Sequence, residues 1–565
     1  MSKISDLIHR CASPRCVFWL TLAVLLLPNV ALCFTERMGL LADIANVVLP
    51  GAVVWLLLAL GRRPGRTALL FLPLMILAAF QLVLLYLFGH SIIAVDMFLN
   101  LVTTNVGEAT ELLGNLLPAI VLVVVVYLPV IVLAVVSLRS GAVLDRPFLR
   151  RQRRCALVAL AVGGVFLAGS YASRPGYSAR LHLYPVNVFY NIVLAVDRSH
   201  ATADYPQTSA DFTFHARPSH AGAVREVYVL VIGETARACS FGLYGYHRDT
   251  TPLLARTGGL VVFSDAVTQS NTTHKSVPML LSAASAEDYD VIYREKGIIT
   301  AFREAGFHTT FVSNQRPNHS FIDIFGREAD DWMFIRERSG RVNMYDDEML
   351  ATVRDVLGRK RPKELIVLHM YGSHFNYRER YRPADAVFRP DTASEARASN
   401  REQLLNAYDN SIRATDRFLS RLIRELDATG AATALLYTSD HGENIFDDSR
   451  KQFLHASPVP TYYELHVPLL VWMSPSYRRL CPAEAAALRA NSRKSVATSA
   501  SVFHTLLSLA GITTPLRVDS LSVAGSGYRC GERHYLNDHN RPVPLKKIMR
   551  DEEDFAMFRK MGLRY

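Results

Sequence analysis

Hydroxyl, imidazole and amine side chains gather in the stretch TQSNTTHKSVPMLLS, residues 268–282. A threonine or serine hydroxyl is a weak nucleophile at its ordinary pKa and needs a base or a metal ion to activate it. The following sequence SVPMLLSAAS predicts a helix from about Ser276, with Pro278 tolerated in the first turn. A hydroxyl just before that start would face free N–H groups, which favour a bound phosphoryl group. Thr272, Thr273 and Ser276 all meet this condition.

Carboxylates and imidazoles follow three apolar stretches that have the composition of buried strands. VLVIGET ends near Glu234, IVLHMYGSH contains His369 and His374, and LLYTSDHGEN contains Asp440 and His441. Open α/β sheets place their sites beyond the carboxyl ends of the strands, so these separate stretches predict one assembled site. Carboxylate and imidazole ligands without cysteine suit a catalytic Zn²⁺ ion that keeps one coordination position open.

Short apolar runs that alternate with helical patterns must position these side chains. Near-continuous apolar strands spaced by helices predict an α/β domain whose largely parallel sheet is covered on both faces. The helices are expected at Met349–Leu357, Asn400–Ala428 and Val496–Leu509. The strands are expected at residues 226–234, 259–266, 308–314, 364–370, 433–440 and 467–473. The C-terminal tail from Leu545 is expected to be a charged surface helix or a frayed end.

The first third of the chain consists of long apolar runs, each close to the ~20 residues that cross a bilayer. Basic loops alternate with residues 89–115, which contain no Lys or Arg, so the basic loops are expected in the cytoplasm. Five spans then place everything after about residue 173 on the far side, which is the periplasm if the host is Gram-negative. The spans are expected at Val17–Phe34, Leu41–Leu60, Thr67–Phe88, Leu116–Leu138 and Cys155–Ala172.

These patterns divide the 565 residues into three parts. Residues 1–172 form a five-helix transmembrane anchor, residues 173–222 a connector with an interfacial helix, and residues 223–565 a periplasmic catalytic domain. The net charge of +11 comes without a basic helix interleaved with aromatics, so no nucleic-acid partner is expected and a membrane with anionic partners is. Only Cys239, Cys481 and Cys530 lie in the exported part, where they allow at most one disulfide; Cys481 with Cys530 is one possible pair.

The ordered motifs VIGETAR…FGLYGYHRDTTP, NTTHKSVPMLLS, HMYGSH, YTSDHGEN and HVPLLVW resemble the lipopolysaccharide phosphoethanolamine transferases. These are membrane-anchored members of the alkaline phosphatase and sulfatase superfamily, and they include the colistin-resistance enzymes, which confer polymyxin resistance. The resemblance covers nearly the whole chain, the five-span anchor included. It implies an alkaline phosphatase-like exported domain on a multi-pass protein of the bacterial inner membrane.

The resemblance also assigns roles to residues. The family's nucleophilic threonine corresponds to Thr273, and the zinc ligands correspond to Glu234, Thr273, Asp440 and His441. One zinc ion is expected, with a second possible during turnover. The residues that would contact the donor lipid, its phosphate or a second zinc ion are His369, His374, His455, Asn100, Thr104 and Glu108. The last three are spaced by four residues, which places them on one face of a helix.

The family reaction transfers phosphoethanolamine from phosphatidylethanolamine to lipopolysaccharide through a covalent threonine intermediate, and a monomer is expected. The colistin-resistance branch has cysteines where this chain has Gln269 and Met279, so the acceptor stays open between lipid A, a core sugar and another periplasmic glycan. A phosphoglycerol transferase shares the anchor and the threonine and is the alternative activity. A sulfatase would need Arg two residues after Pro278, where this chain has Leu280, which argues against that activity. A non-catalytic glycan-binding scaffold would not need all four candidate ligands, so their joint presence favours an enzyme.

Overall fold

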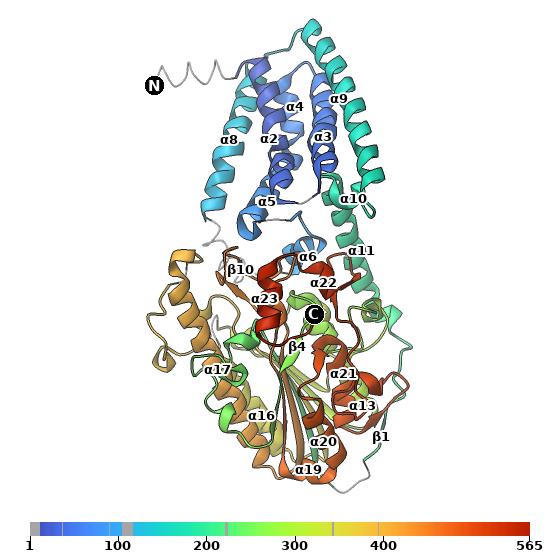
Figure 1. The fold of residues 1–565 in the computed structure, drawn as a ribbon, viewed down its shortest axis with the longest axis vertical. Helices are drawn as coiled ribbons and strands as arrows, with labels where there is room; N and C mark the ends of the chain where they lie inside the picture. The colour runs from blue at the N-terminus through green and yellow to red at the C-terminus, as the bar shows by residue number, and fades with distance from the viewer. Residues whose placement is uncertain are drawn as a thin grey trace. The chain divides into compact units, whose positions relative to one another are not determined.

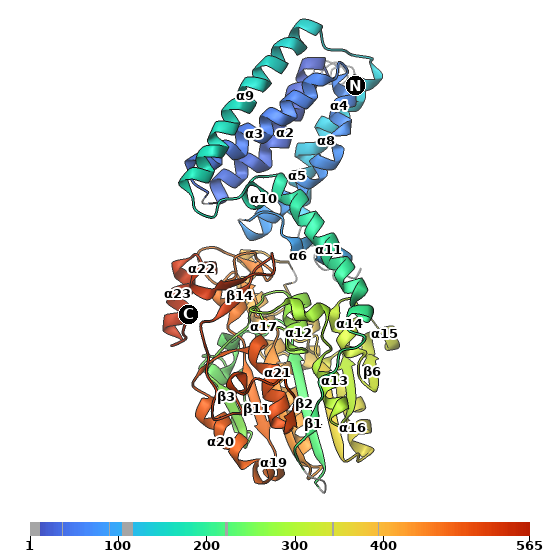
Figure 2. The same ribbon diagram turned by 90° about the vertical axis from the view of Figure 1, so that its right-hand side faces the viewer.

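The computed structural model describes residues 12–36, 38–89, 91–103, 117–220, 224–341, 344–393 and 395–565. These residues belong to two compact units, which are divided along the chain between Leu101 and Val102 and again between Asp197 and Arg198. The helix α11 (Val186–Thr208) crosses the second of these points, and it is longer than the short interfacial helix expected in the connector. Figures 1 and 2 show the elements of each unit.

The first unit is built from apolar helices, and among its described residues four helices are each long and apolar enough to cross a membrane. A fifth span arises if the bent pair α4 and α5, which meet at 57°, is taken as one. The third predicted span is therefore broken near Phe71, because Pro73 in the first turn of α5 has no N–H to continue the helix. The helices are α2 (Pro14–Thr35), α3 (Leu40–Leu60), α4 (Pro64–Leu70), α5 (Leu72–Phe88), α6 (Val95–Thr103), α8 (Leu117–Arg139), α9 (Arg146–Ser173) and α10 (Ala179–His182).

Two buried asparagines connect the helices of this unit. The Asn29 amide donates to the main-chain oxygens of Asn46 and Tyr184 at 2.6 and 2.8 Å, and Asn46 donates back to the Asn29 oxygen at 3.1 Å. Polar groups inside an apolar bundle are stable only when they are paired in this way.

A Cβ at Gly163 of α9 would lie 2.9 Å from the Cα of Leu49, so α3 and α9 approach closely through this glycine.

The second unit contains a seven-stranded sheet in the order β3-β11-β8-β2-β7-β5-β6. All neighbouring pairs are parallel except those made by β11, which runs antiparallel to β3 and β8. The predicted fold class is confirmed, and β6 is a strand that the sequence analysis missed. The strands are β2 (Glu226–Gly233), β3 (Leu260–Phe263), β5 (His308–Ser313), β6 (Asp331–Phe334), β7 (Lys363–His369), β8 (Ala432–Ser439) and β11 (Leu469–Met473).

Helices cover both faces of this sheet, as Figure 1 shows. Along β2, Tyr228, Leu230 and Ile232 enter one apolar core and the alternate valines enter the other, because successive side chains of a strand point to opposite faces. The first core includes residues of α12 (Thr273–Leu280), α13 (Ile298–Glu304) and α21 (Thr498–Leu509). The second includes residues of α16 (Met349–Gly358) and α17 (Arg401–Asp427).

Shorter elements complete the second unit. The predicted strand at residues 259–266 is divided into β3 and β4 (Asp265–Val267), and β4 pairs in parallel with β12 (Ser495–Ala497). The remaining helices are α14 (Phe321–Gly326), α15 (Ile335–Ser339), α18 (Tyr462–Leu465), α19 (Pro475–Leu480), α20 (Pro482–Asn491), α22 (Leu545–Ile548) and α23 (Glu552–Lys560). The remaining strands form three pairs, β1 (Arg217–Pro218) with β13 (Ile512–Thr513), β9 (Asn444–Ile445) with β10 (Phe453–Leu454), and β14 (His534–Leu536) with β15 (Pro542–Pro544).

The three cysteines of the second unit, Cys239, Cys481 and Cys530, are all free thiols in the structure. The possible pairing of Cys481 with Cys530 is therefore wrong for this structure. Cys481 instead lies in the apolar core, and its sulfur is 3.6 Å from Nε2 of His220. Cys11 lies outside the described residues.

The C-terminal tail packs against the domain instead of fraying. Phe558 of α23 is fully buried, and its ring lies edge-on to that of Tyr462 at 5.4 Å. Arg450 binds the buried Asp554 carboxylate through two contacts of 2.6 and 2.9 Å. The sequence does not reveal this packing, because only two residues of α23 are buried and the tail mixes acidic, aromatic and basic residues.

Truncation of the Phe558 side chain should therefore destabilise the second unit. Phe558→Ala is expected to lower the free energy of unfolding by about 3–5 kcal/mol, the usual effect of removing a fully buried phenylalanine side chain. The half-buried neighbour Phe555 provides a matched control, and Phe555→Ala should cost clearly less. Urea unfolding of the full chain, followed by tryptophan fluorescence, measures both, and equal losses would contradict the packing of α23.

Candidate metal and phosphoryl-transfer site

The candidate site lies at the carboxyl ends of two adjacent parallel strands. Glu234 directly follows β2, and Asp440 and His441 directly follow β8, which pairs with β2 up to Gly233 and Ser439. Because both strands end in the same register, their next residues meet at one edge of the sheet. The parallel sheet thus brings together residues that are far apart in sequence. The hydrogen bond between Thr235 and Asp440, for example, joins residues 205 positions apart.

Four predicted residues form one cluster at this edge, three of them buried and Thr273 half-buried. Ligand atoms of Glu234, Asp440 and His441 all lie within 4.8 Å of one another, and the three residues are fully buried. The Thr273 hydroxyl lies 3.1 Å from Oε1 of Glu234 and 3.1 Å from Nε2 of His441. The same Nε2 atom is 3.2 Å from Oδ2 of Asp440 and 3.5 Å from Oε1 of Glu234.

The donor set of this cluster fits a divalent metal ion. His441 Nδ1 lies 2.9 Å from the Gly442 carbonyl oxygen, so a proton on Nδ1 leaves the Nε2 lone pair directed at the cluster. Burial lowers the pKa of His441 to about 4, which keeps the imidazole neutral. Burial also raises the pKa of Asp440, because a desolvated carboxylate is unstable without a nearby cation. Two carboxylates and one imidazole with a hydroxyl beside them suit Zn²⁺.

The helix α12 presents Thr273 to this cluster. It begins at Thr273, three residues earlier than predicted, and Thr272 is its N-cap residue. Pro278 is therefore in the interior of α12 and not in its first turn, so that expectation is wrong. Ser276 donates to Oδ2 of Asp440 at 3.3 Å, and Thr272 contacts the Ser270 hydroxyl at 3.1 Å. Of the three candidate hydroxyls, Thr273 alone lies within hydrogen-bond distance of both Glu234 and His441.

A residue that the sequence analysis did not single out orients Glu234. The Gln315 amide donates to Oε2 of Glu234 and to the Met370 carbonyl oxygen, both at 3.0 Å. Oε1 of Glu234 then faces Thr273 and His441. Gln315 follows β5 closely, in the stretch FVSNQ, so its place near a strand end was the available signal. A glutamine does not ionise, so its side chain suggests a metal or catalytic site less readily than an acid or an imidazole.

Backbone geometry around the cluster is equally specific. Thr235, the residue after Glu234, has φ of 52°, a left-handed conformation that is rare for a β-branched residue. Its N–H donates to Oδ1 of Asp440 at 3.1 Å. Gly372 has φ of 52°, and a Cβ there would lie 2.7 Å from the main-chain N and O of Glu234. The loop 370–374 therefore packs directly on the Glu234 backbone through this glycine.

Two further predicted histidines lie beside the cluster. The His455 ring centroid is 4.1 Å from that of His441, and its Nδ1 is 3.2 Å from a carboxyl oxygen of Glu443. The His374 ring is 6.2 Å from that of His455 and stacks on Tyr371. Burial lowers the pKa of His455 to about 4 and holds the pKa of His374 well below its usual value. Both imidazoles are therefore neutral, with lone pairs available for a metal ion or a proton.

His369, the last residue of β7, has a different environment. Its Nδ1 lies 3.0 Å from the Ser313 hydroxyl, and its Nε2 has no hydrogen-bond partner among the described residues. Burial lowers the pKa of His369 to about 3. Such a buried, neutral nitrogen without a partner carries a desolvation cost, which a bound water or ion would remove.

The predicted lipid-side residues receive no structural account. Thr104 and Glu108 lie outside the described residues, and Asn100 belongs to α6, where its side chain is not described.

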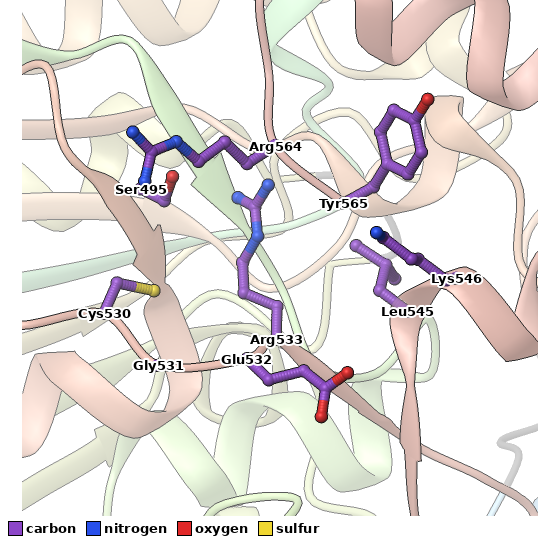
Figure 3. A pocket seen from close by; sticks show the side chains of 9 residues that line it. All are labelled: Ser495, Cys530, Gly531, Glu532, Arg533, Leu545, Lys546, Arg564 and Tyr565. Atoms are coloured by element: carbon purple, nitrogen blue, oxygen red, sulfur yellow. The ribbon is translucent and has the colours of Figure 1, made fainter.

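A separate cavity of about 170 Å³ is shown in Figure 3. It is lined by Ser495, Cys530, Gly531, Glu532, Arg533, Leu545, Lys546, Arg564 and Tyr565 and contains none of the predicted site residues.

If Gln315 orients Glu234, its removal should weaken metal binding without disturbing the fold. Gln315→Leu is expected to lower Zn²⁺ affinity by about 10–100-fold, the usual effect of losing a hydrogen bond to a metal ligand. Competition with a chromophoric chelator measures this affinity on the full chain. Gln403→Leu, at a glutamine whose hydrogen bond to Thr392 is exposed, is the control. Equal affinities in the two variants would contradict the orienting role.

Sequence comparison relates the chain to named phosphoethanolamine transferases. The chain is 30% identical over 293 residues to Kdo(2)-lipid A phosphoethanolamine 7''-transferase of Escherichia coli K12, covering 50% of each chain. It is 30% identical over 265 residues to phosphoethanolamine transferase EptC of E. coli strain RS218, covering 45% of this chain and 46% of EptC. The chain thus spans about half the length of the curated relatives it matches.

Solved structures show the same fold. The membrane protein EptA of Neisseria meningitidis, a lipooligosaccharide phosphoethanolamine transferase, matches with a TM-score of 0.65 and 22% identity, over 90% of this chain and 98% of EptA. The periplasmic domain of E. coli EptC in complex with Zn matches with a TM-score of 0.55 and 24% identity, over 60% of this chain and 97% of that domain. The first match includes the membrane helices, so the expected architecture of apolar helices plus an alkaline phosphatase-like domain is confirmed.

The sulfatase family model matches residues 226–512, more than half of the chain. This range contains the whole seven-stranded sheet and the cluster of Glu234, Thr273, Asp440 and His441. The chain belongs to the sulfatase family.

Proposed function

We propose that this protein is a zinc-dependent phosphoethanolamine transferase of the lipopolysaccharide type. The observation that carries the proposal is the position of the half-buried Thr273 hydroxyl, 3.1 Å from both of the fully buried side chains of Glu234 and His441. The similarity to proteins named phosphoethanolamine transferases supplies the transferred group. The donor would be phosphatidylethanolamine, and the acceptor a lipid A phosphate or a core sugar.

Zinc is the proposed metal, held by Glu234, Asp440 and His441 with the Thr273 oxygen as the remaining ligand. The buried acids and the free Nε2 of His441 fit this ion, and a related EptC domain has been solved with Zn. A bound zinc ion would lower the pKa of the threonine hydroxyl and stabilise charge that develops on the phosphoryl group. One ion is proposed, with His369, His374 and His455 available to a second ion or to the substrate phosphate.

In the first half of the reaction Thr273 acts as the nucleophile. Its Oγ1 atom forms a bond to the phosphorus of phosphatidylethanolamine, and the bond from that phosphorus to the diacylglycerol oxygen breaks. The threonine loses its hydroxyl proton, and the departing diacylglycerol oxygen gains a proton. The N-terminus of α12, which begins at Thr273, directs its free N–H groups toward the phosphoryl oxygens.

In the second half an oxygen of the acceptor phosphate or hydroxyl forms a bond to the phosphorus of the phosphoethanolamine–threonine intermediate. The bond from that phosphorus to Oγ1 of Thr273 breaks, and Oγ1 regains its proton. A neutral imidazole serves here as proton acceptor, and His455 is suitably placed because its ring lies 4.1 Å from that of His441. His374, next along the chain of rings, would hold the substrate phosphate. The two halves use the same cluster, which explains why a single site suffices for donor and acceptor.

The anchor fits this scheme because the donor is a membrane lipid. We place the first unit in the inner membrane of a bacterial cell, as a monomer with the second unit in the periplasm. In this proposal Asn100, Thr104 and Glu108 contact the donor lipid. Two neighbouring activities remain alternatives, a phosphoglycerol transferase and a phosphoethanolamine transferase that modifies another periplasmic glycan. The identity of the donor headgroup distinguishes the first alternative from the proposed activity, and the identity of the acceptor distinguishes the second.

Intact-mass analysis tests the covalent step. After incubation of the zinc-loaded full chain with phosphatidylethanolamine, the protein should gain one phosphoethanolamine group. Thr273→Ala should gain nothing because it lacks the hydroxyl, and Thr273→Ser should retain a reduced rate. Full transfer by Thr273→Ala would remove this residue from the mechanism. A gain from phosphatidylglycerol in place of phosphatidylethanolamine would favour the phosphoglycerol alternative.

Loss of the neighbouring imidazoles should slow transfer without emptying the metal site. His374→Ala and His455→Ala are expected to lower the transfer rate by about 10²-fold or more, a usual contribution of general acid–base catalysis. Metal content measured by mass spectrometry should stay near the wild-type level. His215→Ala, at an exposed histidine outside the cluster, is the control. Wild-type rates in both site variants would exclude these two residues from the reaction.

A further inference from the structure

The cavity of about 170 Å³ in Figure 3 is built by four segments of the second unit that are distant in sequence. They are the first residue of β12, the residues just before β14, the start of α22 and residues 564–565. None of these residues belongs to the metal cluster or has a role in the reaction proposed above. The volume is several times what one water molecule needs. We refer to this space as the basic cavity.

The lining of the basic cavity carries an excess of positive charge. Three of its residues are cations, Arg533, Lys546 and Arg564, whereas Glu532 is its one acidic side chain. The Glu532 side chain is 66% exposed and lies 3.6 Å from Nε2 of His534, outside the lining. Figure 3 shows the Glu532 carboxylate turned away from the Arg533 guanidinium. The positive charge is therefore not neutralised by the acid beside it.

Arg533 is the buried cation of this cavity. Its side chain is only 4% exposed, and its Nη1 atom donates to Oδ1 of Asp265 at 2.6 Å. Its Nη2 atom is also buried, and it has no hydrogen-bond partner among the described residues. A buried N–H of a charged group is costly when it is unpaired, and such a group usually marks a bound water or ion. One half of this guanidinium therefore lacks the acceptor that it needs.

Asp265 cannot supply that second acceptor, because both of its oxygens are already engaged. Oδ2 accepts from the Ser495 hydroxyl at 2.6 Å and from the main-chain N–H of Arg564 at 3.3 Å. Oδ1 accepts from Nη1 of Arg533. These charge-assisted contacts fix the guanidinium in one orientation. Arg533 is thus held in place by one carboxylate while its other nitrogen stays unpaired.

Lys546 and Arg564 bring two further cations that solution can reach. Both residues are exposed, and no carboxylate in the part of the chain that the structure describes pairs with either side chain. The Lys546 ammonium lies 5.9 Å from the centroid of the Tyr565 ring, at the outer limit of a cation–π contact. Figure 3 shows the Arg533 side chain extending between those of Arg564 and Lys546. An anion placed among these cations would relieve their mutual repulsion.

A solvated basic surface is the ordinary explanation of exposed lysine and arginine side chains. It accounts for Lys546 and Arg564, but it does not account for the buried, unpaired nitrogen of Arg533. Water cannot be the whole answer either, because three cations against the single Asp265 carboxylate leave a net positive charge. A bound anion satisfies the nitrogen and the charge together.

The chemistry of the three donors favours a tetrahedral oxyanion. Guanidinium and ammonium groups are the usual partners of phosphate, the first through paired N–H groups and the second as a point charge. The donors come from three separate segments, and a phosphate accepts hydrogen bonds in several directions at once. A planar carboxylate has two oxygens and one negative charge, so it matches fewer donors and less charge.

We propose that the basic cavity binds a phosphate-type oxyanion, either free in solution or as the phosphate monoester of a lipid headgroup. Nη2 of Arg533 is its buried donor, and Lys546 and Arg564 close on it from the solvent side. The proposal is independent of the proposed function, because no residue of the metal cluster takes part.

Equilibrium dialysis of the full chain in detergent against radiolabelled inorganic phosphate tests the site. The double variant Lys546→Gln, Arg564→Gln should bind about one phosphate fewer per chain than the wild type, because two of the three cations are lost. Residue 564 contacts Asp265 through its main-chain N–H, so this contact survives the substitution. The difference between the two proteins is unaffected by any phosphate that binds at the metal cluster.

A matched variant separates the cavity from general surface charge. Arg489 and Lys547 are exposed and do not line the cavity, so Arg489→Gln with Lys547→Gln removes the same charge elsewhere. This control should bind phosphate like the wild type. Equal phosphate content in the wild type and the cavity variant, or equal losses in the two double variants, would overturn the proposal.

Competition on the wild type tests the chemical class without any substitution. Sulfate should displace the labelled phosphate, whereas acetate at the same concentration should leave it bound. Equal displacement by acetate would overturn the assignment to a tetrahedral oxyanion.

The source of the phosphate is decided in lipid nanodiscs. Labelled phosphate is measured on the wild type in discs of phosphatidylcholine with and without phosphatidic acid. Loss of the label with phosphatidic acid supports the site and assigns a lipid phosphate to it. Retention of the label supports the site with free phosphate as its ligand.

Discussion

The burial of Glu234 and Asp440 beside one another is the constraint on which the second unit depends. Both are fully buried, and their oxygens share the space around Nε2 of His441. Two desolvated carboxylates repel each other and are stable only with a cation between them or with protonation. The surrounding structure supplies hydrogen bonds from Gln315, Thr235 and Ser276, which fix the oxygens without neutralising them. A divalent metal ion, as proposed, would complete this arrangement.

The sheet makes this crowding possible. Because β2 and β8 are parallel neighbours that end in register, two acids distant in sequence meet without any long loop. The helix α12 then brings the Thr273 hydroxyl and its positive N-terminal end to the same point. The proposed nucleophile, its proposed activating residues and a helix N-terminus therefore meet at one edge of the sheet.

Much of this was predictable from the sequence, for a physical reason. Buried parallel strands are apolar on both faces, so β2, β7 and β8 stand out, and the polar residues that follow them mark the site. The family resemblance then selected Thr273 from three hydroxyls that local pattern left equal. Other features depend on tertiary contacts that have no local signature. The role of Gln315 depends on its contact with Glu234, and Phe558 is buried because it packs against Tyr462. The bend at Pro73 had a local signal, because proline interrupts a helix, but the length of the apolar run around it suggested one continuous span.

The most direct test of the account is the position of the metal. Crystals of the zinc-soaked protein, measured on both sides of the zinc absorption edge, locate the ion by its anomalous signal. The account predicts one strong peak about 2.0–2.2 Å from carboxyl oxygens of Glu234 and Asp440 and from Nε2 of His441, with the Thr273 oxygen beside it. A strong peak elsewhere, with this cluster empty and its carboxylates bonded only to protein groups, would contradict it.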